Sequence, residues 1–143
     1  MEREDLAALF SRITARLVAA ERPLLAAHGL SMWGYIALSE LARSPAGMQA
    51  DLATAIGYDK TRLIGLLDEL ERNKLITRAP DPTDRRARRV GLTPRGRELH
   101  RRAQADIRAM EAEELAELEP ADRSSLLATL PRLADRRGQR PGR

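Results

Sequence analysis

A cluster of arginines surrounds a turn that the sequence predicts between positions 81 and 93. The four are Arg85, Arg86, Arg88 and Arg89. Pro82 favours the turn, and Val90 and Leu92 then occupy alternate positions, as in a short strand. On that strand Arg88 would share a face with Val90, and Arg89 would lie on the opposite face. A hairpin tipped with arginine can hold a phosphate backbone and enter a narrow nucleic-acid groove. An ordinary solvated loop is the alternative interpretation.

The positive charge of the chain is concentrated around this turn. The net charge of the 143 residues is only +4, yet residues 78–102 hold nine arginines and three acidic residues. The rest of the chain is therefore slightly acidic, and the local basic patch predicts a polyanionic partner that meets one face of the protein. Phe, Trp and Tyr make up only 3% of the residues, too few for the base-stacking surface of a single-strand binder. Double-stranded DNA is the partner that we expect.

Residue types that support other chemistry are scarce or badly spaced. The chain has no cysteine, which excludes disulfides, thiolate metal sites and thiol-based redox sensing. Its two histidines, His28 and His100, lack the spacing of a metal site, and the glutamates at positions 111–117 fall on solvated helix positions. No phosphate-binding glycine loop or nucleophile motif is present. We therefore expect no enzyme activity, no catalytic residue, no metal site and no cofactor.

The hydropathy of the chain predicts no membrane contact. No apolar run is long enough to span a bilayer, and charged residues interrupt the first twenty positions, unlike a signal peptide. The length suits a single domain with a modest core. We expect a cytoplasmic protein.

Two short helices with a tight connection precede the arginine cluster. Apolar spacing predicts helices at about 48–56 and 60–72, joined by Gly57-Tyr58-Asp59, with Asp59 as the N-cap of the second helix. Two helices joined by a glycine-containing turn form a helix-turn-helix. The exposed start of the second helix offers Lys60, Thr61 and Arg62 to a partner.

Four longer segments have helical spacing, at about 4–27, 32–43, 94–118 and from Pro120 to about 135. Ser31 is the predicted N-cap of the second of these, and Thr93 with Pro94 begins the third. The basic residues 136–143 are expected to be disordered. The first helix and the last two carry more apolar surface than the central segment can cover, which predicts a homodimer built from them. A helical bundle within one chain is the alternative.

The order of these elements resembles the MarR family of transcription regulators, over about residues 5–135. The most specific similarity is Asp84-Arg85-Arg86 followed by Leu92-Thr93-Pro94-Arg95-Gly96, which resembles the Asp-x-Arg and Leu-Thr-x-x-Gly of the family's wing. Asp51-Leu52-Ala53 resembles the first helix of the family's helix-turn-helix, and residues 67–71 resemble the end of its recognition helix. Each match is short, but their order and spacing agree.

The resemblance implies a mainly α fold with a small β-wing. A winged helix-turn-helix lobe at about 47–93 would be flanked by long dimerisation helices at about 4–43 and 94–135. The family's members form homodimers, more often repressors than activators, that bind a palindromic operator in double-stranded DNA and can be released by a small organic effector. Trp33 and Tyr35 are candidates for an effector pocket, with plain core packing as the alternative.

In such a dimer the helix at 60–72 would enter the major groove. Arg86, with its guanidinium oriented by Asp84, would enter the minor groove. The candidate DNA-contacting residues are Lys60, Thr61, Arg62, Asp84, Arg85, Arg86, Arg88 and Arg89.

Two positions depart from the family pattern. The family often has Thr-Arg facing the DNA in the middle of the recognition helix, where this chain has Ile64-Gly65, so the residues at the helix start would do more of the reading. The family's glycine before the first wing strand is Lys74 here, and we expect Asn73 to supply the left-handed turn. The Ile64-Gly65 departure leaves a second hypothesis open, a winged-helix module that binds another protein and not DNA.

Overall fold

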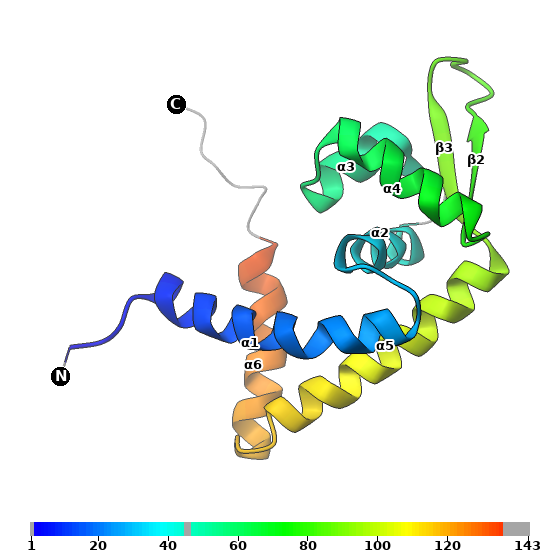
Figure 1. The fold of residues 1–143 in the computed structure, drawn as a ribbon. Helices are drawn as coiled ribbons and strands as arrows, with labels where there is room; N and C mark the ends of the chain where they lie inside the picture. The colour runs from blue at the N-terminus through cyan, green and yellow to red at the C-terminus, as the bar shows by residue number, and fades with distance from the viewer. Residues whose placement is uncertain (1, 45–46, 136–143) are drawn as a thin grey trace, which may run out of the picture. The chain divides into compact units, whose positions relative to one another are not determined.

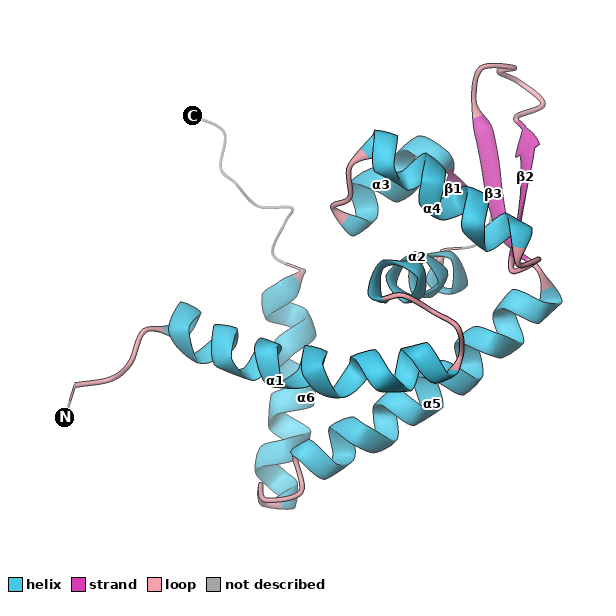
Figure 2. Cartoon of the chain, viewed as in Figure 1, coloured by secondary structure: helices cyan, strands magenta, loops and turns pink. Residues whose placement is uncertain are grey.

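The computed structural model describes residues 2–44 and 47–135, which form six helices and three strands. In chain order these are α1 (Leu6–Ala27), α2 (Met32–Arg43), β1 (Gly47–Met48), α3 (Gln49–Ile56), α4 (Lys60–Arg72), β2 (Ile76–Pro80), β3 (Arg88–Leu92), α5 (Pro94–Glu114) and α6 (Pro120–Ala134). Figures 1 and 2 show these elements. The chain divides into two compact units, up to Arg108 and from Ala109 onward. The predicted disordered tail at 136–143 lies outside the described residues.

Local capping interactions set the helix boundaries in the first unit. Gly29 takes the left-handed conformation (φ 72°) after α1, and the Ser31 hydroxyl accepts a hydrogen bond from the backbone N–H of Gly34 (3.0 Å) at the start of α2. Gly57 (φ 67°) ends α3, and the Asp59 carboxylate accepts from the backbone N–H of Arg62 (2.9 Å) at the start of α4. These N-caps satisfy donors that would otherwise be unpaired, and both were predicted from the sequence.

The three strands form an antiparallel sheet in the order β1-β3-β2. The hairpin pairs Ile76 with Leu92 at its base and Pro80 with Arg88 at its far end. It projects past α3 and α4 as the wing (Figure 1). Strand β1 was not predicted, because two residues carry no alternating pattern, and Met48 was assigned to the following helix instead.

A buried apolar layer joins the helix-turn-helix to the wing. Leu38 of α2, Leu63 and Leu67 of α4, Ile76 of β2 and Val90 of β3 are all at most 1% exposed. Burial of these side chains stabilises the packing of α4 against the sheet, since each contributes about 1.5–3 kcal/mol.

The residue that reverses the chain after α4 is Lys74, so the prediction of Asn73 was wrong. Lys74 has φ 62°, whereas Asn73 has φ −81°. The backbone N–H of Leu75 bonds to the Leu70 carbonyl (3.0 Å) and that of Lys74 bonds to the Glu71 carbonyl (2.9 Å). This pattern is a Schellman motif, which places the left-handed residue one position beyond the cap.

The base of the wing packs tightly on the start of α5. The Leu75 carbonyl accepts from the backbone N–H of Thr93 (3.0 Å), and the Thr93 hydroxyl donates to the Lys74 carbonyl (2.7 Å). The same hydroxyl accepts from the backbone N–H of Gly96 (2.9 Å), as an N-cap does. Gly96 is buried, and a Cβ atom added to it would lie 2.0 Å from the Leu75 carbonyl oxygen. Only glycine fits this contact.

Helix α5 ends at Glu114, about one turn before the predicted end at 118. Beyond it, the backbone N–H groups of Ala116 and Leu118 bond to carbonyls three residues back, those of Glu113 and Leu115. The chain therefore tightens into turns that cannot continue an α-helix. Helix α6 follows with Pro120 in its first turn and no buried residue. None of the helices in the described part of the chain has the length and apolar character needed to cross a membrane.

Candidate nucleic-acid interface

The start of α4 presents exposed polar residues, one of which lies against a pair of packed aromatic rings. Lys60, Thr61 and Arg62 are all exposed. The guanidinium of Arg62 lies 5.2 Å from the centre of the Tyr58 ring, and that ring packs at 4.5 Å and 36° against Trp33 of α2. A cation above an aromatic face is attracted to it, so Tyr58 restricts the orientation of Arg62. The sequence predicted Tyr58 only as a residue of the turn and not as a support for Arg62.

The wing tip exposes Arg85 and Arg86 between the two strands. The Asp84 carboxylate accepts a hydrogen bond from the backbone N–H of Arg86 (3.0 Å). This contact differs from the predicted one, in which Asp84 would hold the Arg86 guanidinium. An Asp side chain readily bonds to the backbone two residues later, so Asp84 shapes the turn that carries Arg86.

Asp81, which sequence reasoning treated only as a turn residue, is a buried anchor of the wing. Its side chain is 5% exposed and accepts from the Thr83 hydroxyl and from Nε of Arg89 (2.7 Å). The hydrogen bond from Thr83, followed by that from Arg89, holds the pKa of Asp81 below its usual value. Arg89 remains 49% exposed, so it joins the wing scaffold while part of its side chain faces solvent.

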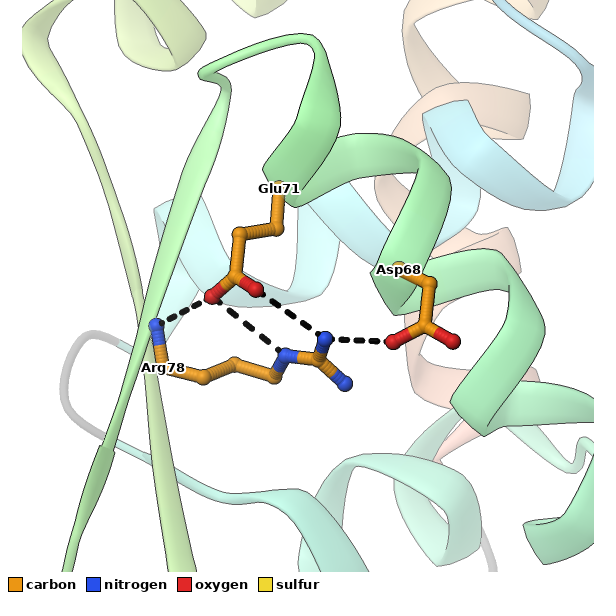
Figure 3. A network of polar contacts seen from close by, with 3 residues as sticks. All are labelled: Asp68, Glu71 and Arg78. Atoms are coloured by element: carbon orange, nitrogen blue, oxygen red, sulfur yellow. Dashed lines mark hydrogen bonds and ion pairs between the residues drawn. The ribbon is translucent and has the colours of Figure 1, made fainter.

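A second ion-pair network connects the wing to α4 (Figure 3). Arg78 of β2 donates to Asp68 (2.5 Å) and to Glu71 (3.1 Å) on one side of the helix, and its backbone N–H also donates to Glu71 (3.2 Å). Arg78 is only 16% exposed, and its hydrogen bonds lower the pKa of Glu71. The network was not predicted, because the spacing of Asp68 and Glu71 places them on one face of the helix but does not identify the cation that they share.

Three of the predicted DNA-contacting residues line one groove of about 410 Å³, whereas Thr61 and Arg62 do not line it. Lys60 and Ile64 line it from α4, while Arg86 and Arg88 line it from the wing. Arg88 therefore faces the recognition helix, whereas Arg89 is bonded to Asp81. Three cations outnumber the one carboxylate of the lining, that of Asp51, so the groove carries net positive charge and attracts phosphates. Arg85 is exposed at the wing tip and is not among the residues that line this groove.

The two candidates for an effector pocket occupy different environments. Trp33 packs on Tyr58, and Tyr35 stacks on His100 at 5.4 Å. His100 in turn bonds through Nε2 to the Ser39 hydroxyl (2.9 Å), and burial lowers its pKa. Neither Trp33 nor Tyr35 lines the groove of about 640 Å³ that His100 borders. The residues that do are Ile36, Ser39, Glu40, Ala42, Arg43, Ala55, Ile56, His100 and Gln104.

The other histidine is also engaged in a protein contact. His28, at the end of α1, lies 2.6 Å from the Asp106 carboxylate of α5. Within residues 2–44 and 47–135, no group of three or more histidine, aspartate or glutamate side chains is arranged to hold a metal ion.

Comparison with known proteins supports the same assignment. The sequence profile of the MarR family matches residues 28–87. A protein of Thauera aromatica, assigned as the transcriptional regulatory protein for the hcr operon, is 30% identical over 112 residues, which cover 78% of this chain and 68% of that protein.

Two solved structures extend the similarity to the three-dimensional fold. The repressor CouR of Rhodococcus jostii RHA1, bound to a 23-mer DNA duplex, is 27% identical with a TM-score of 0.78, over 94% of this chain and 99% of CouR. BpsR of Bordetella bronchiseptica, whose DNA binding is regulated by 6-hydroxynicotinic acid, is 26% identical with a TM-score of 0.77, over 92% of this chain and 94% of BpsR. The helix-turn-helix, the arginine-tipped wing and these relationships agree, and the chain belongs to the MarR family of transcription regulators.

Proposed function

We propose that this protein is a transcriptional repressor that binds a palindromic operator in double-stranded DNA as a homodimer. The observation that carries the proposal is the groove in which Lys60 of α4 meets Arg86 and Arg88 of the wing. The relative CouR, which has the same fold, is a repressor that was solved on a DNA duplex. The electropositive surface and the family membership thus point to one partner.

The residues of the interface divide between the two DNA grooves. The start of α4 enters the major groove, where Lys60, Thr61 and Arg62 contact base edges or phosphates. Arg86 enters the minor groove from the wing tip, because a narrow minor groove attracts arginine electrostatically. Arg85 and Arg88 contact phosphates on either side of it.

Arg89 adds a phosphate contact from a fixed position, since its Nε atom is already bonded to Asp81. Asp84 contributes indirectly by shaping the turn below Arg86.

The homodimer is supported by apolar side chains that remain exposed on the terminal helices. On α1, Leu6, Phe10 and Ile13 are 41–56% exposed, and of the 22 residues of that helix only Leu25 is buried. On α6, Leu126, Leu127 and Leu133 are 37–52% exposed. A monomer seldom leaves this much apolar surface in water, whereas a two-fold partner would bury it.

A small organic effector would bind in the groove beside His100. This groove offers Ile36 and Ile56 as apolar walls and Ser39, His100 and Gln104 as polar groups, a composition typical of small-molecule sites. The relative BpsR responds to an aromatic acid, which sets the size of ligand to try first. Binding of such an acid would raise the melting temperature and lower the affinity for DNA.

The decisive experiment is fluorescence anisotropy of the purified protein on duplexes selected from a random library, over about 50 to 300 mM salt. If a dimer neutralises about eight phosphates, the logarithm of affinity should fall against the logarithm of salt with a slope near −7. Arg86→Ala should weaken binding several-fold, whereas Arg132→Ala, which removes an exposed arginine from α6, should not. A salt-insensitive complex with another protein and no selected duplex would instead support the protein-interaction hypothesis.

A further inference from the structure

The middle of α4 presents an apolar side chain to the solvent. Ile64 is 47% exposed, although the other branched apolar residues of this helix turn inward or are half-buried. Its neighbour Gly65 has no side chain, and a Cβ atom placed there would meet nothing within 4 Å. Between Arg62 and Asp68, this turn of α4 therefore offers no hydrogen-bonding side chain.

Ile64 lies among the charged residues of the proposed DNA interface. It lines the groove that contains Lys60, Arg86 and Arg88, and it also lines an adjoining groove of about 460 Å³ with Arg88. The acidic residues next to it, Asp68 and Glu71, are paired with Arg78, so they present less negative charge to a phosphate backbone. An apolar group surrounded by phosphate-binding cations would be brought against the bases when the protein binds DNA.

The chemistry of the major groove limits what Ile64 can contact. Base edges there display hydrogen-bond donors and acceptors, together with one apolar group, the C5-methyl of thymine. Opposite a polar edge, Ile64 would remove water from a donor or acceptor without replacing the lost hydrogen bond, which is unfavourable. Opposite a thymine methyl, both apolar surfaces leave water together.

We propose that Ile64 is a specificity-determining residue that contacts the C5-methyl group of a thymine in each half of the operator. The inference rests on the proposed function, because it requires α4 to lie in the major groove. Gly65 assists, since the absence of a side chain lets the helix backbone approach the base edges. Selection at this position therefore comes from shape and apolar contact, while Lys60 and Arg62 supply polar contacts at the helix start.

The test replaces thymine with deoxyuridine, which keeps every hydrogen-bonding group and removes only the methyl. Each thymine of a duplex selected from a random library is replaced in turn, at symmetric positions in the two halves. The wild-type protein should lose about fourfold in affinity per half-site at one position, the value expected for one buried methyl group. At the remaining thymines the change should be small.

The variant Ile64→Ala separates this contact from general effects on the duplex. It should bind the unmodified operator more weakly and should be insensitive to deoxyuridine at the position that Ile64 contacts. Ile64→Val, which keeps a branched apolar side chain, should retain part of the sensitivity. Because Ile64 is half exposed, both variants should keep the circular dichroism spectrum and melting temperature of the wild type within a few degrees.

The outcomes distinguish this inference from the proposed function. A protein that selects no duplex over a scrambled sequence contradicts both. Selective binding in which no deoxyuridine substitution matters, or in which Ile64→Ala remains as sensitive as the wild type, overturns the thymine contact and leaves the regulator intact.

Discussion

The same substitution, glycine to alanine, should have opposite effects at two helical positions of this protein. At Gly96 the added Cβ atom would lie 2.0 Å from the Leu75 carbonyl oxygen and 2.8 Å from the carbonyl carbon. At Gly65 it would meet no atom within 4 Å. The two sites therefore compare a steric clash with the intrinsic helix preference of alanine over glycine.

The expected magnitudes follow from what must move. Real Cβ atoms essentially never approach a neighbour closer than 3.0 Å, so Gly96→Ala must push the wing base and α5 apart by about 1 Å. That shift breaks the hydrogen bond from Thr93 to Leu75, and the overpacking adds strain. Together they should lower the free energy of unfolding by about 2–4 kcal/mol. Gly65→Ala should instead raise it by about 0.5–1 kcal/mol.

Urea unfolding followed by circular dichroism measures both values, with all proteins at one concentration because the stability of a dimer depends on it. Anisotropy on DNA adds a second readout, since the displaced wing of Gly96→Ala should also weaken binding. Gly96→Ala that unfolds at the same urea concentration as the wild type, or Gly65→Ala that is less stable than the wild type, would contradict these predictions.

Three other predictions concern the turn after α4, the wing and the start of the recognition helix. Lys74→Gly should raise the free energy of unfolding by about 0.5–1 kcal/mol, because glycine adopts positive φ without strain. Asn73→Gly, at negative φ, should lower the free energy of unfolding, and urea unfolding that ranks the two variants the other way would contradict the Schellman assignment. The pKa of Asp81 is lowered in the folded state, so the ionised carboxylate stabilises the protein fully above the unfolded-state pKa, and this stabilisation is lost as the pH falls through the folded-state pKa. Asp81→Asn should therefore be less stable than the wild type at pH 7, and its urea midpoints, measured from pH 7 to 3, should lack this acid dependence. Tyr58→Leu should weaken DNA binding by about two- to fivefold by removing the ring beneath Arg62, whereas Tyr58→Phe should not. Equal losses of DNA affinity in the two variants, measured by anisotropy, would exclude a role for the cation–ring contact.

Features fixed by neighbouring residues were predictable from the sequence. Helix α4 has the predicted bounds, because the Asp59 cap and the leucine spacing both act within a few residues. The hairpin and its arginine tip were likewise predicted from turn residues and alternation. Lys60, Thr61, Arg62, Arg85 and Arg86 are exposed, as a contact with DNA requires.

Features that depend on distant side chains were not predictable. The Arg78 network needs the register of β2 against α4, and the buried position of Asp81 needs the path of the wing loop. Asp84 shows the limit well, because the sequence placed it in the right turn but could not distinguish a backbone N–H from a guanidinium as its donor. The Asn73 prediction failed because the hydrogen bonds of the Schellman motif, and not residue preference alone, decide which position reverses.

The open space around Gly65 has a consequence for how such a regulator can diverge. A substitution that changes operator recognition is useful only if the protein still folds, and most substitutions lower stability. Here the exposed turn of α4 is free of that constraint, because new side chains at Gly65 would project into solvent and the helix is held from its other side by Leu63 and Leu67. A duplicated copy of this gene could therefore acquire a different operator by single substitutions that leave the folded protein intact, and the same position is the natural starting point for building regulators that do not cross-react.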